Sequence, residues 1–255
     1  MTQDELLEYL KQEYDKQFAL LKRQIDLAYA DYSNDIKYEI KAAKNDIGTY
    51  KPGTKHNKKI RELDKRIDKR TDELFEEVSS LFNKTMSNCY DLGYKGTRKS
   101  IYKSKVIKPE AYQAMKKKDM KYNLWSGMHY DDRIQNHKEK LVFTLKSKIT
   151  SSIIRDDSLG YAYNDAYKSI QNQLKALDRL CKTEMNAMVV MGQLRCYHVN
   201  NILEIQAVLD ERCCEECKRH DGKKVKVLDA KVGINIPPFH TSCRCSVKEV
   251  KKEEQ

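Results

Sequence analysis

Cysteine and histidine side chains gather near the end of this sequence at spacings typical of metal sites. Cys214 and Cys217 form a Cys-x2-Cys pair, and the cluster His240, Cys243 and Cys245 follows after a loop. Zinc takes four nitrogen or sulfur ligands in a tetrahedron, and two ligands separated by two residues can bind one ion from a tight turn. The pattern therefore predicts a metal site made from four of these five side chains.

The predicted metal is Zn²⁺, and its predicted role is structural. Four protein ligands leave no open coordination position, and a full site contributes on the order of 10 kcal/mol to folding. The alternative left open by the residues is a packed cluster of reduced thiols without metal. It is also open which two of His240, Cys243 and Cys245 complete the site. His240 and Cys243 have turn spacing, whereas Cys243 and Cys245 alternate as they would on a strand.

Two arginines flank the predicted ligands. Arg212 precedes the first cysteine pair and Arg244 lies between Cys243 and Cys245. Thiolates concentrate negative charge, so a nearby guanidinium can donate hydrogen bonds to sulfur or to backbone carbonyls. We expect Arg212 and Arg244 to support the ligands in this way, with Asp210 orienting Arg212.

The net charge of +11 is clustered along the chain. Residues 51–70 hold nine Lys or Arg against three acids, and residues 95–121 hold ten against two. Such runs favour an acidic partner, either DNA bound without sequence specificity or an acidic protein surface, although a solvated face gives the same pattern. The residues predicted to make this contact are Lys99, Lys103, Lys105, Lys116, Lys117 and Lys118.

Apolar periodicity predicts the elements that must position these residues. A capping box at Thr2 and Glu5 opens a seam with steps of three and four residues, and a second seam begins at Ile60 and fades near Gly93 and Gly96. Residues 48–53 separate the two seams. We therefore expect a long helical hairpin, with the character of a coiled-coil arm, that packs on itself, on the C-terminal part or on a partner.

The rest of the chain predicts a helical bundle and a small β module. A helix capped by Asp131 and Asp132, a second helix ending near Leu174 and a last helix from Leu177 to Leu194 make the bundle. β-prone residues 202–209 and 225–227 predict an antiparallel hairpin beside the cysteine turn. The expected fold is mainly α. Its predicted parts are the helical hairpin (1–92), a basic linker (93–125), the bundle (126–200) and a zinc-stapled β knuckle (201–255).

Several classes of protein are disfavoured by the composition. No run of about 18 apolar residues predicts a membrane span, and the acidic N-terminal residues do not resemble a secretion signal. Eight cysteines in such a chain indicate reduced thiols or metal ligands. We expect no enzymatic activity and no small-molecule substrate, because no zinc-protease, nucleophile-elbow or phosphate-loop pattern is present.

The motif of the last 45 residues carries a family resemblance. Asp210-x-Arg212-x-Cys214-x-x-Cys217, the turn at Gly222, and Pro237-Pro238-x-His240-x-x-Cys243-Arg244-Cys245 resemble the C-terminal motif of phage minor head proteins, the phage Mu F-like family. The resemblance extends over roughly residues 125–248. It places Cys214 and Cys217 on the two family cysteines and leaves Cys213 as a spare thiol.

The resemblance implies a minor capsid protein that acts in head morphogenesis. The implied location is the portal vertex of the phage head in the virion, reached through the host cytoplasm during assembly. The implied partners are the portal protein and other capsid or scaffold proteins, and the implied roles include contact with packaged DNA and an influence on its ejection. The alternative is a zinc-containing DNA-binding regulatory protein. A third hypothesis is a metal-dependent nuclease or a toxin fused to a head-protein module.

Overall fold

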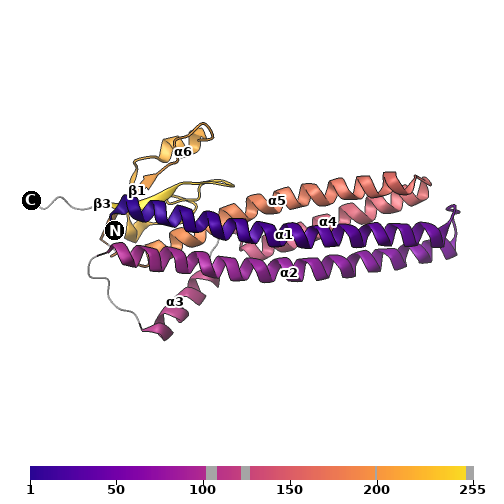
Figure 1. Ribbon diagram of the computed structural model, residues 1–255, viewed down its shortest axis with the longest axis horizontal. Helices are drawn as coiled ribbons and strands as arrows, with labels where there is room; N and C mark the ends of the chain where they lie inside the picture. Colours follow the sequence, from indigo (N-terminus) through magenta and orange to yellow (C-terminus); the bar gives the residue numbers. More distant parts are fainter. Residues whose placement is uncertain (102–107, 122–126, 199, 251–255) are drawn as a thin grey trace, which may run out of the picture. The chain divides into compact units, whose positions relative to one another are not determined.

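The computed structural model describes residues 1–101, 108–121, 127–198 and 200–250. Its long elements are helices (Figure 1): α1 (Gln3–Ile47), α2 (Thr54–Ser100), α3 (Pro109–Lys121), α4 (Tyr130–Ile154) and α5 (Leu159–Leu194). The later elements are short: β1 (Ile202–Gln206), α6 (Glu215–His220), β2 (Lys224–Lys226), a 3₁₀ turn (Val227–Asp229) and β3 (Ser246–Val250). The predicted mainly α fold with a small C-terminal β module is confirmed.

The chain divides into two compact units. The helical unit contains residues 22–81 and 131–178, and the knuckle unit contains residues 1–21, 82–130 and 179–255. Helices α1, α2 and α5 contribute one part to each unit, so neither unit is a continuous stretch of sequence. The predicted parts, with boundaries at residues 92, 125 and 200, are each continuous in sequence. That division stays a prediction.

The predicted seams supply the core of the helical unit. Its most deeply buried side chains, each at most 1% exposed, come from four helices: Ile25, Ile36, Leu63, Ile67, Leu141, Leu145, Ile149 and Ile170. The Tyr32 and Thr71 hydroxyls share a buried hydrogen bond of 2.8 Å between α1 and α2. Lys146 binds Asp68 at 2.5 Å, which links α4 to α2. The hairpin thus packs on the C-terminal helices, one of the arrangements expected from its seams.

The start of α1 has the predicted capping box. The Thr2 backbone N–H donates to Glu5 Oε2 at 2.7 Å, and the Glu5 N–H donates to Thr2 Oγ1 at 3.1 Å. Two backbone donors that have no partner within the helix are satisfied in this way.

Two helix boundaries differ from the sequence-based expectation. Helix α2 was predicted to fade at Gly93 and Gly96, but it continues to Ser100. A Cβ on Gly93 would lie 2.0 Å from the Val189 carbonyl oxygen, so this glycine lets α2 approach the α5 backbone closely. The predicted break between residues 174 and 177 was also wrong, since α5 is one helix of 36 residues. No Gly or Pro interrupts it between residues 161 and 191.

The predicted β-hairpin is confirmed and gains a third strand. The sheet has the order β2-β1-β3, and both pairings are antiparallel. Cys243 and Cys245 precede β3, so they are not on a strand as their alternation predicted. A small apolar cluster joins the sheet to α5 and contains Val190, Tyr197, Leu203, Ile236 and Val247. Among the described residues, no helix combines the length and apolarity needed to cross a membrane.

Candidate metal centre

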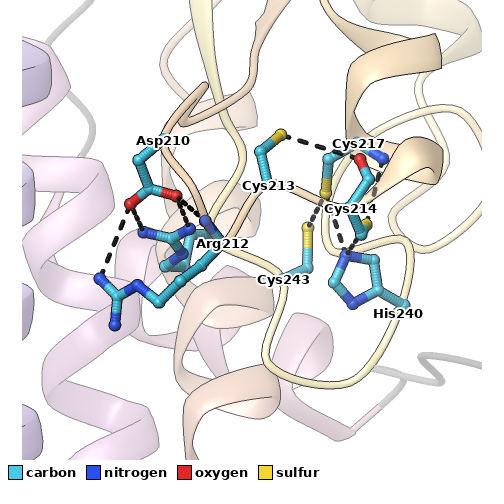
Figure 2. A network of polar contacts seen from close by, with 8 residues as sticks. Asp210, Arg212, Cys213, Cys214, Cys217, His240 and Cys243 are labelled. Atoms are coloured by element: carbon cyan, nitrogen blue, oxygen red, sulfur yellow. Dashed lines mark hydrogen bonds and ion pairs between the residues drawn. The ribbon is translucent and has the colours of Figure 1, made fainter.

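The first two predicted ligands lie at the start of helix α6. Cys214 is its N-cap residue, and the Cys214 sulfur accepts a hydrogen bond of 3.4 Å from the Cys217 backbone N–H. Cys217 lies within the first turn of α6, so the Cys-x2-Cys spacing directs both sulfurs toward the same point. His240 approaches that point from a separate loop (Figure 2).

The His240 ring is oriented as a metal ligand would be. Its Nε2 lies 3.2 Å from the Cys214 sulfur and 3.0 Å from the Cys217 sulfur. Its Nδ1 lies 2.9 Å from the Thr241 carbonyl oxygen. A proton on Nδ1 donated to that carbonyl leaves the Nε2 lone pair facing the two sulfurs.

The remaining cysteines make a second group that shares Cys217. The sulfurs of Cys217 and Cys243 are 3.8 Å apart, and the ligand atoms of Cys217, Cys243 and Cys245 lie within 4.8 Å of one another. Zinc–sulfur bonds of about 2.3 Å in a tetrahedron place two sulfurs about 3.8 Å apart. The described residues thus bring all five predicted ligands into two overlapping groups, and Cys217 belongs to both.

The donor atoms fit zinc. Thiolates and imidazole suit Zn²⁺, whereas Ca²⁺ and Mg²⁺ require oxygen ligands. Cys217, Cys243 and Cys245 are buried with Ile205, while Cys214 lies at the exposed edge. These side chains could hold a metal ion.

Two thiols of the cluster have a pKa below that of an ordinary cysteine. A hydrogen bond from the Cys245 thiol lowers the pKa of Cys243 to about 5. The Cys217 backbone N–H lowers the pKa of Cys214. Burial instead raises the pKa of Cys217 to about 12. Each ligand group therefore contains one thiol with a lowered pKa, and metal binding requires the thiolate form.

Helix α5 fixes the loop that carries the later ligands. The Asn186 amide donates to the carbonyl oxygens of Cys243 at 3.0 Å and Cys245 at 3.1 Å. The Ser242 backbone N–H donates to Thr183 Oγ1 at 2.8 Å. Thr183 and Asn186 thus both contact the metal module from α5, and the sequence pattern of the ligands does not point to Asn186. A lone Asn in a helix has no sequence pattern that links it to a loop more than 50 residues later.

The residues predicted to support the ligands form an ion pair beside them. Arg244 donates to both carboxylate oxygens of Asp210, at 2.6 Å and 2.5 Å. This bidentate pair holds the pKa of Asp210 well below its usual range. Arg212 lies 3.7 Å from Asp210 and is 81% exposed. Asp210 thus contacts both arginines: it accepts a hydrogen bond of 3.0 Å from the Arg212 backbone N–H, and its bidentate pair with Arg244 joins the two ends of the motif.

The match to known proteins lies on this region. Residues 144–248 match the family model of the phage Mu protein F like proteins. The match covers less than half of the chain. It contains the end of α4, all of α5 and the knuckle up to Lys248 in β3, where the resemblance inferred from the motif also ended. No curated protein and no solved structure matches this chain.

Within the matched segment, Cys213 lies outside both ligand groups, as expected for a spare thiol. Its sulfur is 3.7 Å from the Cys214 carbonyl oxygen. His220 stacks on Phe239 with ring centroids 3.9 Å apart, which joins α6 to the His240 loop. Neither this stack nor its two residues were predicted to contribute to the site.

The lysines predicted to contact DNA or an acidic partner lie outside the matched segment. Lys116 is buried and binds Asp91 at 2.6 Å, so its charge is neutralised within the chain and does not face a partner. Lys99 lies 5.3 Å from the ring centre of Tyr9. Lys117 and Lys118 are exposed. Lys103 and Lys105 lie outside the described residues.

Proposed function

We propose that this protein is a minor capsid protein that acts in phage head morphogenesis at the portal vertex of the procapsid. One observation carries the proposal. The segment that matches the phage Mu protein F like family contains all five Cys and His side chains, together with Thr183 and Asn186 that hold their loop. The proposed partners are the portal protein and other capsid or scaffold proteins, and the proposed location is the virion.

The metal in this proposal is structural Zn²⁺, bound by four of Cys214, Cys217, His240, Cys243 and Cys245. When bound, it supplies a fixed tetrahedral crosslink between the α6 turn and the loop before β3. The proposed role is not enzymatic, because four protein ligands leave no position for a reacting water. The residues around the site hold the backbone in place. Asn186 holds the ligand loop, and the ion pair between Asp210 and Arg244 joins the two ends of the motif.

A complementation experiment tests the assembly role. A phage that lacks this gene would be supplied with the wild-type chain, with Cys217→Ser or with the matched control Cys213→Ser. We expect wild type and Cys213→Ser to restore DNA-filled heads and to copurify with portal-containing procapsids, whereas Cys217→Ser fails. Normal heads without any copy of the chain would contradict the proposal.

One observation favours the alternative function, a zinc-containing DNA-binding regulator. The stretch after Cys214 was expected to be strand and turn, but it forms helix α6. That helix has only six residues, and exposed Glu215 and Glu216 open it. A recognition helix instead presents basic and polar side chains to the major groove. Sequence-specific binding to a short operator, abolished by Arg219→Ala, would favour the regulator.

A further inference from the structure

The first turns of α2 carry a row of basic side chains that the metal module does not use. Lys55, Lys58, Arg61 and Lys65 are exposed and follow one another at steps of three and four residues. Residues at these steps lie on one face of a helix. Leu63 and Ile67, which are fully buried, lie on the opposite face. We call these four side chains the α2 basic stripe.

The stripe differs from its neighbours in having no internal counter-charge. Lys59 binds Asp46, Arg66 binds Glu39 at 2.7 Å and Lys69 lies 3.8 Å from Glu73. No stripe residue makes an ion pair within the part of the chain that the structure describes, although exposed Glu62 lies beside it. Acidic side chains thus neutralise the cations that flank the stripe, and the stripe cations stay exposed to bind a partner.

The start of α2 also differs in charge from the starts of α1 and α4, whereas α5 likewise begins without an acid but has no cation in its first turn. α1 begins with Asp4 and Glu5, and α4 with Asp131 and Asp132. α2 has no acid in its first turn and has Lys55 there. A cation at a helix N-terminus is unfavourable. A local rule broken without internal compensation is expected where the residue serves function.

The surroundings of the stripe distinguish between two kinds of acidic partner. Protein interfaces have an apolar centre and are depleted in Lys. No large apolar side chain of α2, which the structure describes in full, is exposed. The exposed Tyr38 of α1 lies beside Glu39. Glu39 pairs with Arg66 and Arg70 beyond the end of the stripe. A nucleic-acid backbone needs no apolar anchor, because its affinity comes from phosphate charges neutralised by Lys and Arg. From Lys55 to Lys65 the stripe spans about 15 Å. A DNA duplex presents about nine charges over that length.

We propose that the α2 basic stripe binds the phosphate backbone of double-stranded DNA without sequence specificity. The stripe lies in the basic run at residues 51–70, it is separate from the lysines at residues 99–118 that were singled out for contact with DNA or an acidic partner, and it does not rest on the proposed role in head assembly. Lys55, Lys58, Arg61 and Lys65 contact phosphates, and the buried face of α2 keeps the row in register.

The test compares two triple variants of the full-length protein that remove the same charge. Lys58→Gln, Arg61→Gln and Lys65→Gln remove three stripe cations, while Lys99→Gln, Lys117→Gln and Lys118→Gln remove three from the other basic cluster. Gln keeps helix propensity. Fluorescence anisotropy with a random duplex of about 30 base pairs measures affinity between about 50 and 200 mM salt. Circular dichroism checks that both variants are folded.

We expect the stripe variant to bind on the order of 100- to 1,000-fold more weakly at about 100 mM salt, with a salt dependence reduced by about two to three in log–log slope. The control triple keeps wild-type affinity and slope. Equal weakening in both triples would overturn the proposal, because net charge alone would then explain binding. Unchanged DNA binding in the stripe variant would overturn it as well. If that variant also lost binding to a capsid protein, the partner of the stripe would be an acidic protein surface.

Discussion

Asn186 holds the metal-ligand loop from outside the cysteine cluster. One side-chain amide satisfies the carbonyls of both Cys243 and Cys245. Removal of a hydrogen-bond donor leaves such acceptors unpaired, at a cost of about 1–3 kcal/mol for each group that becomes buried without a partner. The residue would therefore act on a bound metal through the backbone that carries two of the candidate ligands.

We predict that Asn186→Ala lowers zinc affinity by about 10- to 100-fold, because loss of the groups that orient metal ligands has effects of this size. Competition with a chromophoric chelator measures the affinity. Asn172→Ala makes the same chemical change on the exposed surface of the same helix and is expected to leave affinity unchanged. An Asn186→Ala protein with wild-type affinity would show that the loop is held by other contacts.

Single residues differ in how far the sequence reveals them. Cys214, Cys217, His240, Cys243 and Cys245 could be proposed because their spacing is local and their chemistry is specific. The pairing of Asp210 with Arg244 could not, because the two residues are 34 positions apart and Arg212 is nearer in sequence. Sequence spacing predicts ligands within a turn, but the partner of a charge depends on the tertiary fold.

At the scale of elements, two glycines set the contact between α2 and α5 in the knuckle unit. A Cβ on Gly93 would lie 2.0 Å from the Val189 carbonyl oxygen, and one on Gly192 would lie 2.2 Å from the Tyr90 carbonyl oxygen. Backbone atoms cannot move aside as a flexible side chain can. Each helix therefore needs a glycine where it meets the other.

We predict that Gly93→Ala and Gly192→Ala each destabilise the protein by about 1–3 kcal/mol, because the added methyl group forces the helices apart. Denaturant unfolding followed by circular dichroism measures the change. Gly160→Ala is the control. A Cβ there meets nothing within 4 Å, so helix propensity alone should make this variant neutral or more stable. A neutral Gly93→Ala would mean that the helices do not pack this closely in solution.

Apolar periodicity located the helices better than it located their ends. The seams of α1, α2 and α4 were predicted because burial of one face repeats every three to four residues. The extension of α2 through Gly93 was missed, since glycine is unfavourable in an isolated helix and its benefit lies in a contact with α5. The third strand, β3, was missed for a related reason, because its pairing partner Ile202–Gln206 lies 40 residues earlier.

At the scale of the whole molecule, the two kinds of structure depend on different forces. The helical unit has a long apolar core drawn from four helices. The sheet and the cysteine loops have two small apolar clusters, one of which consists mostly of the predicted ligands. A module of this size needs a further source of stability, and a structural zinc supplies on the order of 10 kcal/mol.

We therefore predict that metal removal unfolds the β knuckle, the sheet and cysteine loops that follow α5, before it unfolds the helices. After treatment with a strong chelator under reducing conditions, amide hydrogens of β1 and β3 should exchange rapidly, while most of the helical circular dichroism signal remains. Mass-spectrometric hydrogen exchange resolves the two regions. Complete loss of helix on chelation would contradict this division, and unchanged protection in β1 would show that the knuckle needs no metal.

If the Cys and His cluster binds a structural zinc, the purified protein contains the metal in a fixed ratio to the chain. Wild type, Cys213→Ser and Cys217→Ser would be purified under reducing conditions without chelators and assayed by elemental mass spectrometry. Because Cys217 belongs to both ligand groups and Cys213 to neither, we predict about one zinc per chain in wild type and Cys213→Ser, and almost none in Cys217→Ser. A wild-type protein without metal, or a Cys217→Ser protein with about one zinc per chain, would show that this cluster is not a zinc site.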